Sequence, residues 1–371
     1  MKTVAFVRTT NIYDDSRATK EITALAEAGY HVVVLGWDRN GEAQEKSKEA
    51  FKNLNVECRF FTCLLPTGIG IKNIDKLVKW LSWTKRQLKT IEKLDAVHAC
   101  NLDGGLGAYQ FCRENGIILV YDIYDYYIDS HAIPEIVKSY VEKIEIKIIN
   151  YSTTTIICTE ERREQIQKAS PHNILVIHNS PDVPEIKQKE TPYDYAYCGS
   201  LCDLRLIKEI LDGYKDHMNL HFAFAGNDKY KSDVERLAKT YGNIDYYGTI
   251  PYSQVLEIES QAKVLSAIYE PSIRNHKLCA PNKFYEALAL GKPLIVCRGT
   301  GIDTIVEENK LGKVINYNAK EFYQALLDLL SSPSDMIDIG ERARLLYERK
   351  YKWALMKQKL IKLYIDMIGL R

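Results

Sequence analysis

Residues 280–295, APNKFYEALALGKPLI, contain a loop, a helix and a strand in immediate succession. Pro281 suits the start of the helix, and Gly291 with Pro293 suits its end. Lys283 and Glu286 are three residues apart and therefore share one face of the first turn. The apolar run that follows, PLIV, is typical of a buried parallel strand. The stretch therefore predicts one αβ step of an α/β domain.

The same alternation extends in both directions from this stretch. Amphipathic helical segments separate short apolar runs, which predicts parallel sheets covered on both faces. The runs expected to be strands are Thr3–Arg8, His31–Trp37, Val56–Phe61, Ala96–Ala99, Ile117–Tyr121, Thr154–Cys158, Ile174–Ile177, Tyr195–Cys198, His221–Ala225, Ile244–Gly248, Val264–Ile268, Pro293–Val296 and Val314–Ile315.

A polar, proline-bearing segment interrupts the alternation at Ser180–Pro184 and Lys187–Pro192, and is read as a linker. The fold class expected is α/β, with two doubly wound Rossmann-like domains facing a cleft. Residues 1–182 would form the first domain and residues 183–350 the second. A final helix at about 351–371 would be free to pack back on the first domain. Ligands of such sheets bind at the carboxyl ends of the strands.

Composition excludes several classes of protein. The formal net charge of +1 gives no general attraction to nucleic acid. Nine cysteines occur without a CxxC pair, which argues against a zinc or redox site and favours reduced thiols in a cytoplasmic protein. The N-terminus lacks the features of a signal peptide, and no apolar run is long enough to span a bilayer.

The start of the helix at Pro281 offers chemistry suited to a diphosphate. Helix N-termini present free N–H groups and the positive end of the dipole, and Lys283 adds a full positive charge. Glu286 has the acceptors for two vicinal ribose hydroxyls. The alternative is a surface ion pair between Lys283 and Glu286, and chemistry alone favours that alternative because such pairs are common.

The pattern P-N-K-x-x-E-x-x-A-x-G-K-P resembles the donor-site signature of GT-B glycosyltransferases, in particular the retaining glycosyltransferase family 4. Further segments resemble the family in the same order along nearly the whole chain, and their order makes the match specific. These segments are Asp15–Val32, Val97–Asn101, Ile177–Ser180 and Tyr197–Leu201 followed by Arg205.

The resemblance implies roles on the donor side. Glu286 would bind the ribose, Lys283 would lie near the diphosphate, and Arg205 would hold the diphosphate and steady the leaving group. The full set of donor-binding candidates is Gly199, Ser200, Arg205, Asn275, Asn282, Lys283 and Glu286. Without the resemblance, Arg205 would be read as a solvated residue in the first turn of a helix.

Two positions depart from the family pattern. Leu278 stands where the first glutamate of the family's paired motif would fall, which leaves Arg274, Asn275, His276 and Lys277 either as substitute contacts or as a mobile polar loop. Tyr124 stands where related enzymes carry a histidine that contacts the donor sugar. The second departure leaves both the sugar and the stereochemical outcome open.

The first domain would supply the acceptor side. An inverting transfer needs a general base, whereas the resemblance implies that a retaining transfer uses the leaving phosphate itself. The catalytic candidates are Asp125, Arg205 and Lys283, and the acceptor-side candidates are Asp15, Arg17, Asp103, Tyr124 and Asp125. Asp15 is also a good N-cap for a helix that begins near Arg17, and His98 is expected to be structural.

No D-x-D triplet occurs, so neither a metal nor another cofactor is expected, and cations with the helix dipole would stabilise the departing diphosphate. The function expected is hexosyl or deoxyhexosyl transfer (EC 2.4) from a UDP-, GDP- or dTDP-sugar. The acceptor would be an oligosaccharide or a lipid-linked precursor of capsule or O-antigen type. A nucleotide-sugar epimerase of the same fold and a non-catalytic GT-B donor-binding or scaffold protein are the alternatives.

Residues 71–94 combine lysines with two tryptophans in a helical pattern. Such a basic amphipathic helix can rest on anionic lipid at the inner face of the plasma membrane. An ordinary surface helix with its apolar side in the core is an equally good interpretation. The membrane-facing candidates are Lys76, Lys79, Trp80, Trp83, Lys85 and Arg86.

Overall fold

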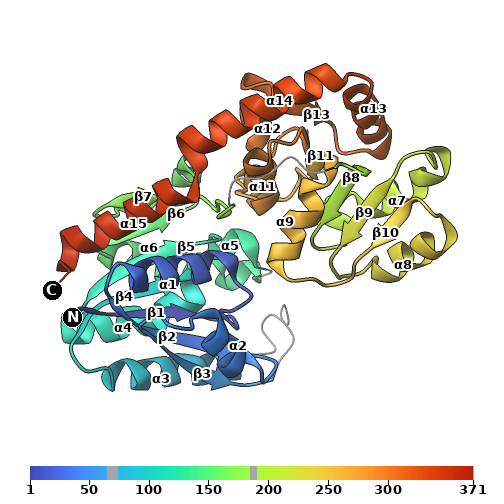
Figure 1. The fold of residues 1–371 in the computed structure, drawn as a ribbon. Coiled ribbons are helices and arrows are strands. Elements are labelled where there is room, and N and C mark those ends of the chain that lie inside the picture. The colour runs from blue at the N-terminus through green and yellow to red at the C-terminus, as the bar shows by residue number, and fades with distance from the viewer. Residues whose placement is uncertain (65–73, 132, 184–189, 371) are drawn as a thin grey trace. The chain divides into compact units, whose positions relative to one another are not determined.

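The computed structural model describes residues 1–64, 74–131, 133–183 and 190–370 (Figure 1). Its contacts divide the chain into two compact units. The N-terminal unit comprises Met1–His178 and Met356–Arg371, and the C-terminal unit comprises Asn179–Leu355. The C-terminal unit begins one residue before Ser180, where the linker expected from the sequence starts; residues 184–189 lie outside the described part of the chain.

A parallel sheet of seven strands forms the centre of the N-terminal unit, in the order β3-β2-β1-β4-β5-β6-β7. The order reverses direction at β1 and β4, as in a doubly wound sheet. Its strands are β1 (Thr3–Arg8), β2 (His31–Asp38), β3 (Val56–Thr62), β4 (Leu94–Cys100), β5 (Ile118–Ile123), β6 (Thr154–Ile157) and β7 (Ile174–Val176). The helices of this unit's first segment are α1 (Ser16–Glu27), α2 (Ala43–Ala50), α3 (Ile74–Lys89), α4 (Asn101–Asn115), α5 (Tyr127–Ser130) and α6 (Glu135–Tyr151).

The C-terminal unit repeats this plan with six parallel strands in the order β10-β9-β8-β11-β12-β13, which reverses at β8 and β11. Its strands are β8 (Tyr193–Cys198), β9 (Phe222–Ala225), β10 (Ile244–Tyr246), β11 (Ala262–Ala267), β12 (Leu294–Cys297) and β13 (Gly312–Ile315). Its helices are α7 (Ile207–Gly213), α8 (Lys231–Thr240), α9 (Tyr252–Ser260), α10 (Arg274–Lys277), α11 (Asn282–Leu290), α12 (Ile302–Glu308), α13 (Ala319–Leu330) and α14 (Pro333–Leu346).

Every strand expected from the sequence is present, and each end lies within two residues of its expected position. The agreement follows from burial, because strands covered on both faces are apolar throughout and stand out from amphipathic helices. β12, for example, is buried along its whole length. The α/β fold class with two doubly wound sheets is therefore confirmed.

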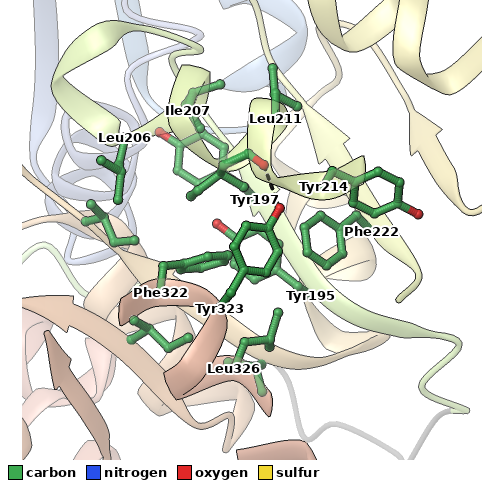
Figure 2. Packing of buried hydrophobic residues seen from close by; sticks show 14 of the residues in the cluster. Tyr195, Tyr197, Leu206, Ile207, Leu211, Tyr214, Phe222, Phe322, Tyr323 and Leu326 are labelled. Carbon is green, nitrogen blue, oxygen red and sulfur yellow. Dashed lines mark hydrogen bonds between the residues drawn. The ribbon is translucent and has the colours of Figure 1, made fainter. Parts of the chain in front are cut away.

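Aromatic side chains dominate the core of the C-terminal unit (Figure 2). Tyr195 of β8 lies edge-on to Phe222 and Phe322, with 5.1 Å between ring centroids in each pair. Tyr214 and Tyr323 place their hydroxyls on main-chain carbonyls, so these large side chains are buried without losing hydrogen bonds. This core fixes β8, whose carboxyl end carries Gly199.

The last helix, α15 (Trp353–Ile368), begins in the C-terminal unit and continues in the N-terminal unit. Lys357 pairs with Glu27 of α1, and Tyr30 donates a hydrogen bond to the carbonyl of Gly369. Tyr364 is fully buried and its hydroxyl lies 2.9 Å from Nδ1 of His98. The chain end is therefore an integral part of the N-terminal unit.

Candidate functional site

Helix α11 begins and ends where the sequence predicts. Pro281 is its N-cap residue, and Gly291 closes it with φ of 62°, a left-handed conformation that favours glycine. Residues 284–290 are all buried, and Glu286 is 2% exposed. The alternative of a surface ion pair between Lys283 and Glu286 is therefore wrong, because Glu286 is not on the surface.

The Lys283 side chain lies across the carboxyl end of β8. Its Nζ is 4.9 Å from the centre of the Tyr197 ring and 4.0 Å from Oε1 of Glu259. A Cβ added at Gly199 would meet this Nζ at 2.9 Å, so the ammonium lies directly against the main chain of Gly199 and would have to shift if a side chain were present there. Burial alone would lower the pKa of Lys283, but the charges of Glu259 and then Glu286 more than offset it and raise that pKa. Lys283 is thus a firmly cationic group beside a bare stretch of main chain.

Arg205 lies in the short turn Asp203–Arg205 that follows β8. Its guanidinium carbon is 3.8 Å from the centre of the Tyr269 ring, a cation–π contact. Nη1 donates hydrogen bonds to the carbonyl of Leu204 and, at 3.5 Å, to Nε2 of His276. The Arg205 side chain is therefore held in place by these contacts, and the alternative interpretation of a freely solvated residue is wrong.

Tyr269 lies close to both cations. Burial raises its pKa, while the positive charges of Arg205 and Lys283 oppose the rise. Tyr269 is the second residue after β11, and Gly199 is the first after β8, so both stand at the point where the strand order of this sheet reverses. This is the position where open α/β sheets bind ligands. We call Gly199, Arg205, Tyr269, Lys283 and Glu286 the donor-side cluster.

The segment that precedes α11 is partly helical. Residues Arg274–Lys277 form α10, in which His276 is buried and its Nδ1 lies 2.9 Å from the carbonyl of Glu270. The alternative of a mobile polar loop does not fit these contacts. Asn275 is half-buried in the same turn, whereas Asn282 is exposed at the start of α11. Of the other donor candidates, Ser200 is exposed and donates to the carboxylate of Asp228.

Sequence reasoning missed two residues of α9 that contact α11. Glu259 is 2% exposed and lies beside Lys283. Tyr252, seven residues earlier on the same helix face, interacts with Glu286: burial raises its pKa, and the charge and hydrogen bonding of Glu286 raise it further. A glutamate next to the buried Ile258, directly ahead of an apolar strand, was the available signal for Glu259.

Gly226 allows the two loops at this edge of the sheet to approach each other. Its φ is 131°, and a Cβ there would lie 1.9 Å from the carbonyl oxygen of Gly199. We expect Gly226→Ala to lower the free energy of unfolding by about 2–4 kcal/mol, because the main chain must move. Urea unfolding measures this. Gly242→Ala is the control, since nothing lies within 4 Å of a Cβ at Gly242; equal losses in the two variants would contradict the expectation.

A buried charge cluster lies in the N-terminal unit. Arg17 of α1 is 5% exposed, with Nε 3.1 Å from Glu21 and Nη2 2.9 Å from Asp122 of β5. The Tyr124 ring lies between the guanidinium groups of Arg8 and Arg17, 4.3 and 4.6 Å from its centre, and its hydroxyl donates to Glu21. The assignment of Arg17 and Tyr124 to the acceptor side is corrected accordingly, because both are committed to the protein interior.

His98 completes this cluster, as a structural histidine would. Its Nε2 faces Asp122 at 3.4 Å and Glu21 at 3.7 Å, and all three side chains are fully buried. Their ligand atoms lie within 4.8 Å of one another, close enough to surround a cation. The Arg17 guanidinium already supplies a positive charge to both carboxylates, so a metal ion would have to compete with it.

The remaining acceptor-side candidates are nearer to solvent. Asp15 is the N-cap of α1, accepts from the Ala18 N–H, and also pairs with Arg8. The Asp125 carboxylate is 45% exposed and lies 3.1 Å from Nη2 of Arg162. Asp103, in the first turn of α4, accepts from the hydroxyl of Thr9. Asp125 is the most accessible carboxylate of these three.

The proposed membrane helix corresponds to α3, whose expected residues 71–73 lie outside the described part. Trp80 is completely buried and donates from Nε1 to the carbonyl of Asp103, and Trp83 stacks on Trp80. The assignment of Trp80 to a membrane-facing surface is therefore wrong, because this side chain is inside the protein. Lys85 pairs with Glu114, while Lys79 and Arg86 are exposed.

Two general expectations can be compared with the structure. All nine cysteines lie in the described part of the chain and carry free thiols. Among the helices described, none is long and apolar enough to cross a membrane.

A family comparison matches residues 202–332 to "Glycosyl transferases group 1". This range includes Arg205, Tyr269, Lys283 and Glu286, but it is only about a third of the chain. A curated relative, spore coat protein SA of Bacillus subtilis (strain 168), is 32% identical over 82 residues, and the match spans 22% of each protein.

Solved structures resemble the chain over its whole length. Sucrose-phosphate synthase of Thermosynechococcus elongatus aligns over 100% of both chains with a TM-score of 0.70 and 14% identity. A mutant of S. aureus TarM in complex with Fondaparinux, alpha-GlcNAc-glycerol and UDP aligns over 98% of this chain and 100% of its own, with a TM-score of 0.67 and 13% identity. Identities this low establish the fold and not the substrate. The chain has the GT-B fold, and its residues 202–332 match the family model of the group 1 glycosyltransferases.

Proposed function

We propose that the protein transfers a sugar from a nucleotide-sugar donor to a hydroxyl group of an acceptor, without a metal ion. The supporting observation is the pair of cations in the donor-side cluster. Arg205 and Lys283 come from different elements, and both lie near Tyr269 where the strand order reverses. Two preset cations, Lys283 beside the main chain of Gly199 and Arg205 over the Tyr269 ring, suit the diphosphate of such a donor.

The proposed reaction breaks the bond between the anomeric carbon and the diphosphate oxygen and forms a bond to the acceptor oxygen. Negative charge then develops on the departing diphosphate, where Arg205 and Lys283 stabilise it. In a retaining transfer the acceptor proton passes to a leaving diphosphate oxygen, and the nucleoside diphosphate is released. In an inverting transfer a carboxylate takes the proton, and Asp125 is our candidate because its carboxylate is accessible.

The acceptor proposed is an oligosaccharide or lipid-linked precursor of a surface polysaccharide of capsule or O-antigen type. Two considerations support it: the sequence resemblance described above, and the sugar compounds named with the TarM complex. The site of action proposed is the cytoplasmic face of the plasma membrane. Lys79 and Arg86 are exposed cations of α3 that are available for anionic lipid.

A thermal-shift panel of UDP, GDP, dTDP and CMP, each with and without EDTA, tests donor binding. A ligand that binds only the folded state raises the melting temperature, so the matching nucleotide is expected to do so equally with EDTA. UDP is the first choice, because the TarM complex contains it. The absence of any shift would overturn the proposal. Release of the nucleotide from its sugar conjugate, measured with acceptor saccharides, then tests transfer.

Glu286→Ala is expected to weaken binding of that nucleotide by about 10–100-fold, because two ribose hydroxyls would lose a carboxylate acceptor. Isothermal titration calorimetry measures the loss. The matching deoxyribonucleotide is the discriminating ligand: its affinity should fall less, since it lacks one hydroxyl. Equal losses for both nucleotides would exclude ribose recognition by Glu286. Glu308→Ala, which lies at the end of α12 and is exposed, provides the control.

A further inference from the structure

Glu259 stands out among the buried ionisable groups of the C-terminal unit that the proposed reaction does not use. It is 2% exposed, and its Oε2 lies buried without a hydrogen-bond partner. A buried carboxylate without compensation is strongly destabilising, so the ionised form of Glu259 depends on a nearby positive charge. The Lys283 ammonium, 4.0 Å from Oε1, is the cation that meets it.

The surroundings of Lys283 show why this contact matters. Besides Glu259, the ionisable groups that act on the ammonium are Glu286 on its own helix, Cys198 at the end of β8, and Tyr269 after β11. Of these groups, only the glutamates belong to a residue type that ordinarily carries a negative charge near neutral pH. Burial, and then the charge of Glu286, raise the pKa of Glu259 well above its ordinary value, and the Lys283 ammonium opposes this rise. Glu286 is assigned to the ribose in the proposed function, which leaves Glu259 as the carboxylate dedicated to the lysine.

The geometry separates the two roles. Glu259 belongs to α9, and its side chain is only 3% exposed and faces the ammonium, whereas the lysine side chain is 14% exposed and reaches the main chain of Gly199. A carboxylate buried in this way contacts the lysine and not the ligand. It therefore acts on the ligand only through Lys283.

We propose that Glu259 is a positioning residue that keeps Lys283 charged and directed at the diphosphate of the donor. This inference rests on the proposed function for the identity of the ligand. The charge effect on Lys283 itself does not depend on any ligand.

The first test measures the lysine directly. Reductive methylation with ¹³C-formaldehyde labels lysine side chains, and the signal missing from Lys283→Met assigns Lys283. Glu259→Gln should lower the pKa of Lys283 by about one unit or more, because burial then dominates. Glu257→Gln, an exposed position on the same helix, is the control and should leave that pKa unchanged. An unchanged pKa in Glu259→Gln would overturn the proposal.

The second test uses UDP affinity as a function of pH. The lysine charge is lost as pH rises through its pKa, so Glu259→Gln should bind UDP nearly as tightly as wild type at pH 6.5 and progressively more weakly than wild type as pH rises to 9 and above, in step with the uncharged fraction of Lys283. In the Lys283→Arg background this difference between the two pH values should vanish, since arginine stays charged. In the Lys283→Met background, Glu259→Gln should leave the affinity for UDP unchanged at both pH values.

The outcomes distinguish the two proposals. A lowered Lys283 pKa together with no UDP binding by wild type would uphold the role of Glu259 toward the lysine and reject the ligand. A loss of affinity that is the same at both pH values, or that persists in the Lys283→Met background, would show that Glu259 acts through the fold and not through the lysine charge.

Discussion

Replacing Lys283 with methionine is expected to lower kcat for sugar transfer by about 10²–10³-fold. Removal of one preset group that stabilises developing negative charge typically has this effect. Methionine keeps most of the lysine stem, so the packing on Gly199 and on the Tyr197 ring is largely retained. The loss should therefore be one of charge and not of structure.

Steady-state kinetics with the matched nucleotide sugar measures this effect. Because Lys283→Met leaves Glu259 buried without its cation, the same measurement is made on Lys283→Met combined with Glu259→Gln, and urea unfolding verifies that both variants are folded under the assay conditions. Lys320→Met, an exposed position on α13, is the control and should retain wild-type kcat. The effect on KM distinguishes substrate binding from catalysis. A raised KM with unchanged kcat would mean that Lys283 binds the ground state as tightly as the transition state. That result would remove Lys283 from the stabilisation of the leaving group.

Local sequence patterns were sufficient for the architecture and for α11. Buried parallel strands are apolar along their whole length, and helix ends carry distinctive residues such as Pro281 and Gly291. Both signals are contained within a few consecutive residues. The family pattern added Arg205 and Lys283, and the structure brings both to Tyr269.

Long-range contacts were not predictable in this way. Arg17 and Glu21 share a helix face, but their partner Asp122 lies on β5, more than a hundred residues away. The pattern of α3 fits a lipid surface as well as a protein core, and only tertiary packing buries Trp80. The position of Glu259 next to Ile258 hints at its burial, but nothing local reveals that this glutamate will face a lysine on another helix.

The second large effect concerns stability of the N-terminal unit. Arg17→Met is expected to lower its free energy of unfolding by about 3–5 kcal/mol, because Glu21 and Asp122 would remain buried without their cation. Tryptophan fluorescence suits the measurement, since Trp37, Trp80 and Trp83 all lie in this unit and only Trp353 lies in the other. Arg163→Met removes an exposed pair with Glu160 and should cost less than about 1 kcal/mol.

The dependence on pH separates lost charge compensation from lost packing. Burial by itself would raise the pKa of Asp122, and in wild type Arg17, followed by His98, more than offsets this and lowers it. Without Arg17 the folded state favours the protonated carboxyl, so it binds more protons than the unfolded state. The deficit of the variant should therefore shrink from pH 8 to pH 5. Adding Asp122→Asn should recover part of the loss at pH 8, whereas a deficit independent of pH and of Asp122 would mean that Arg17 matters through its packing on Tyr124.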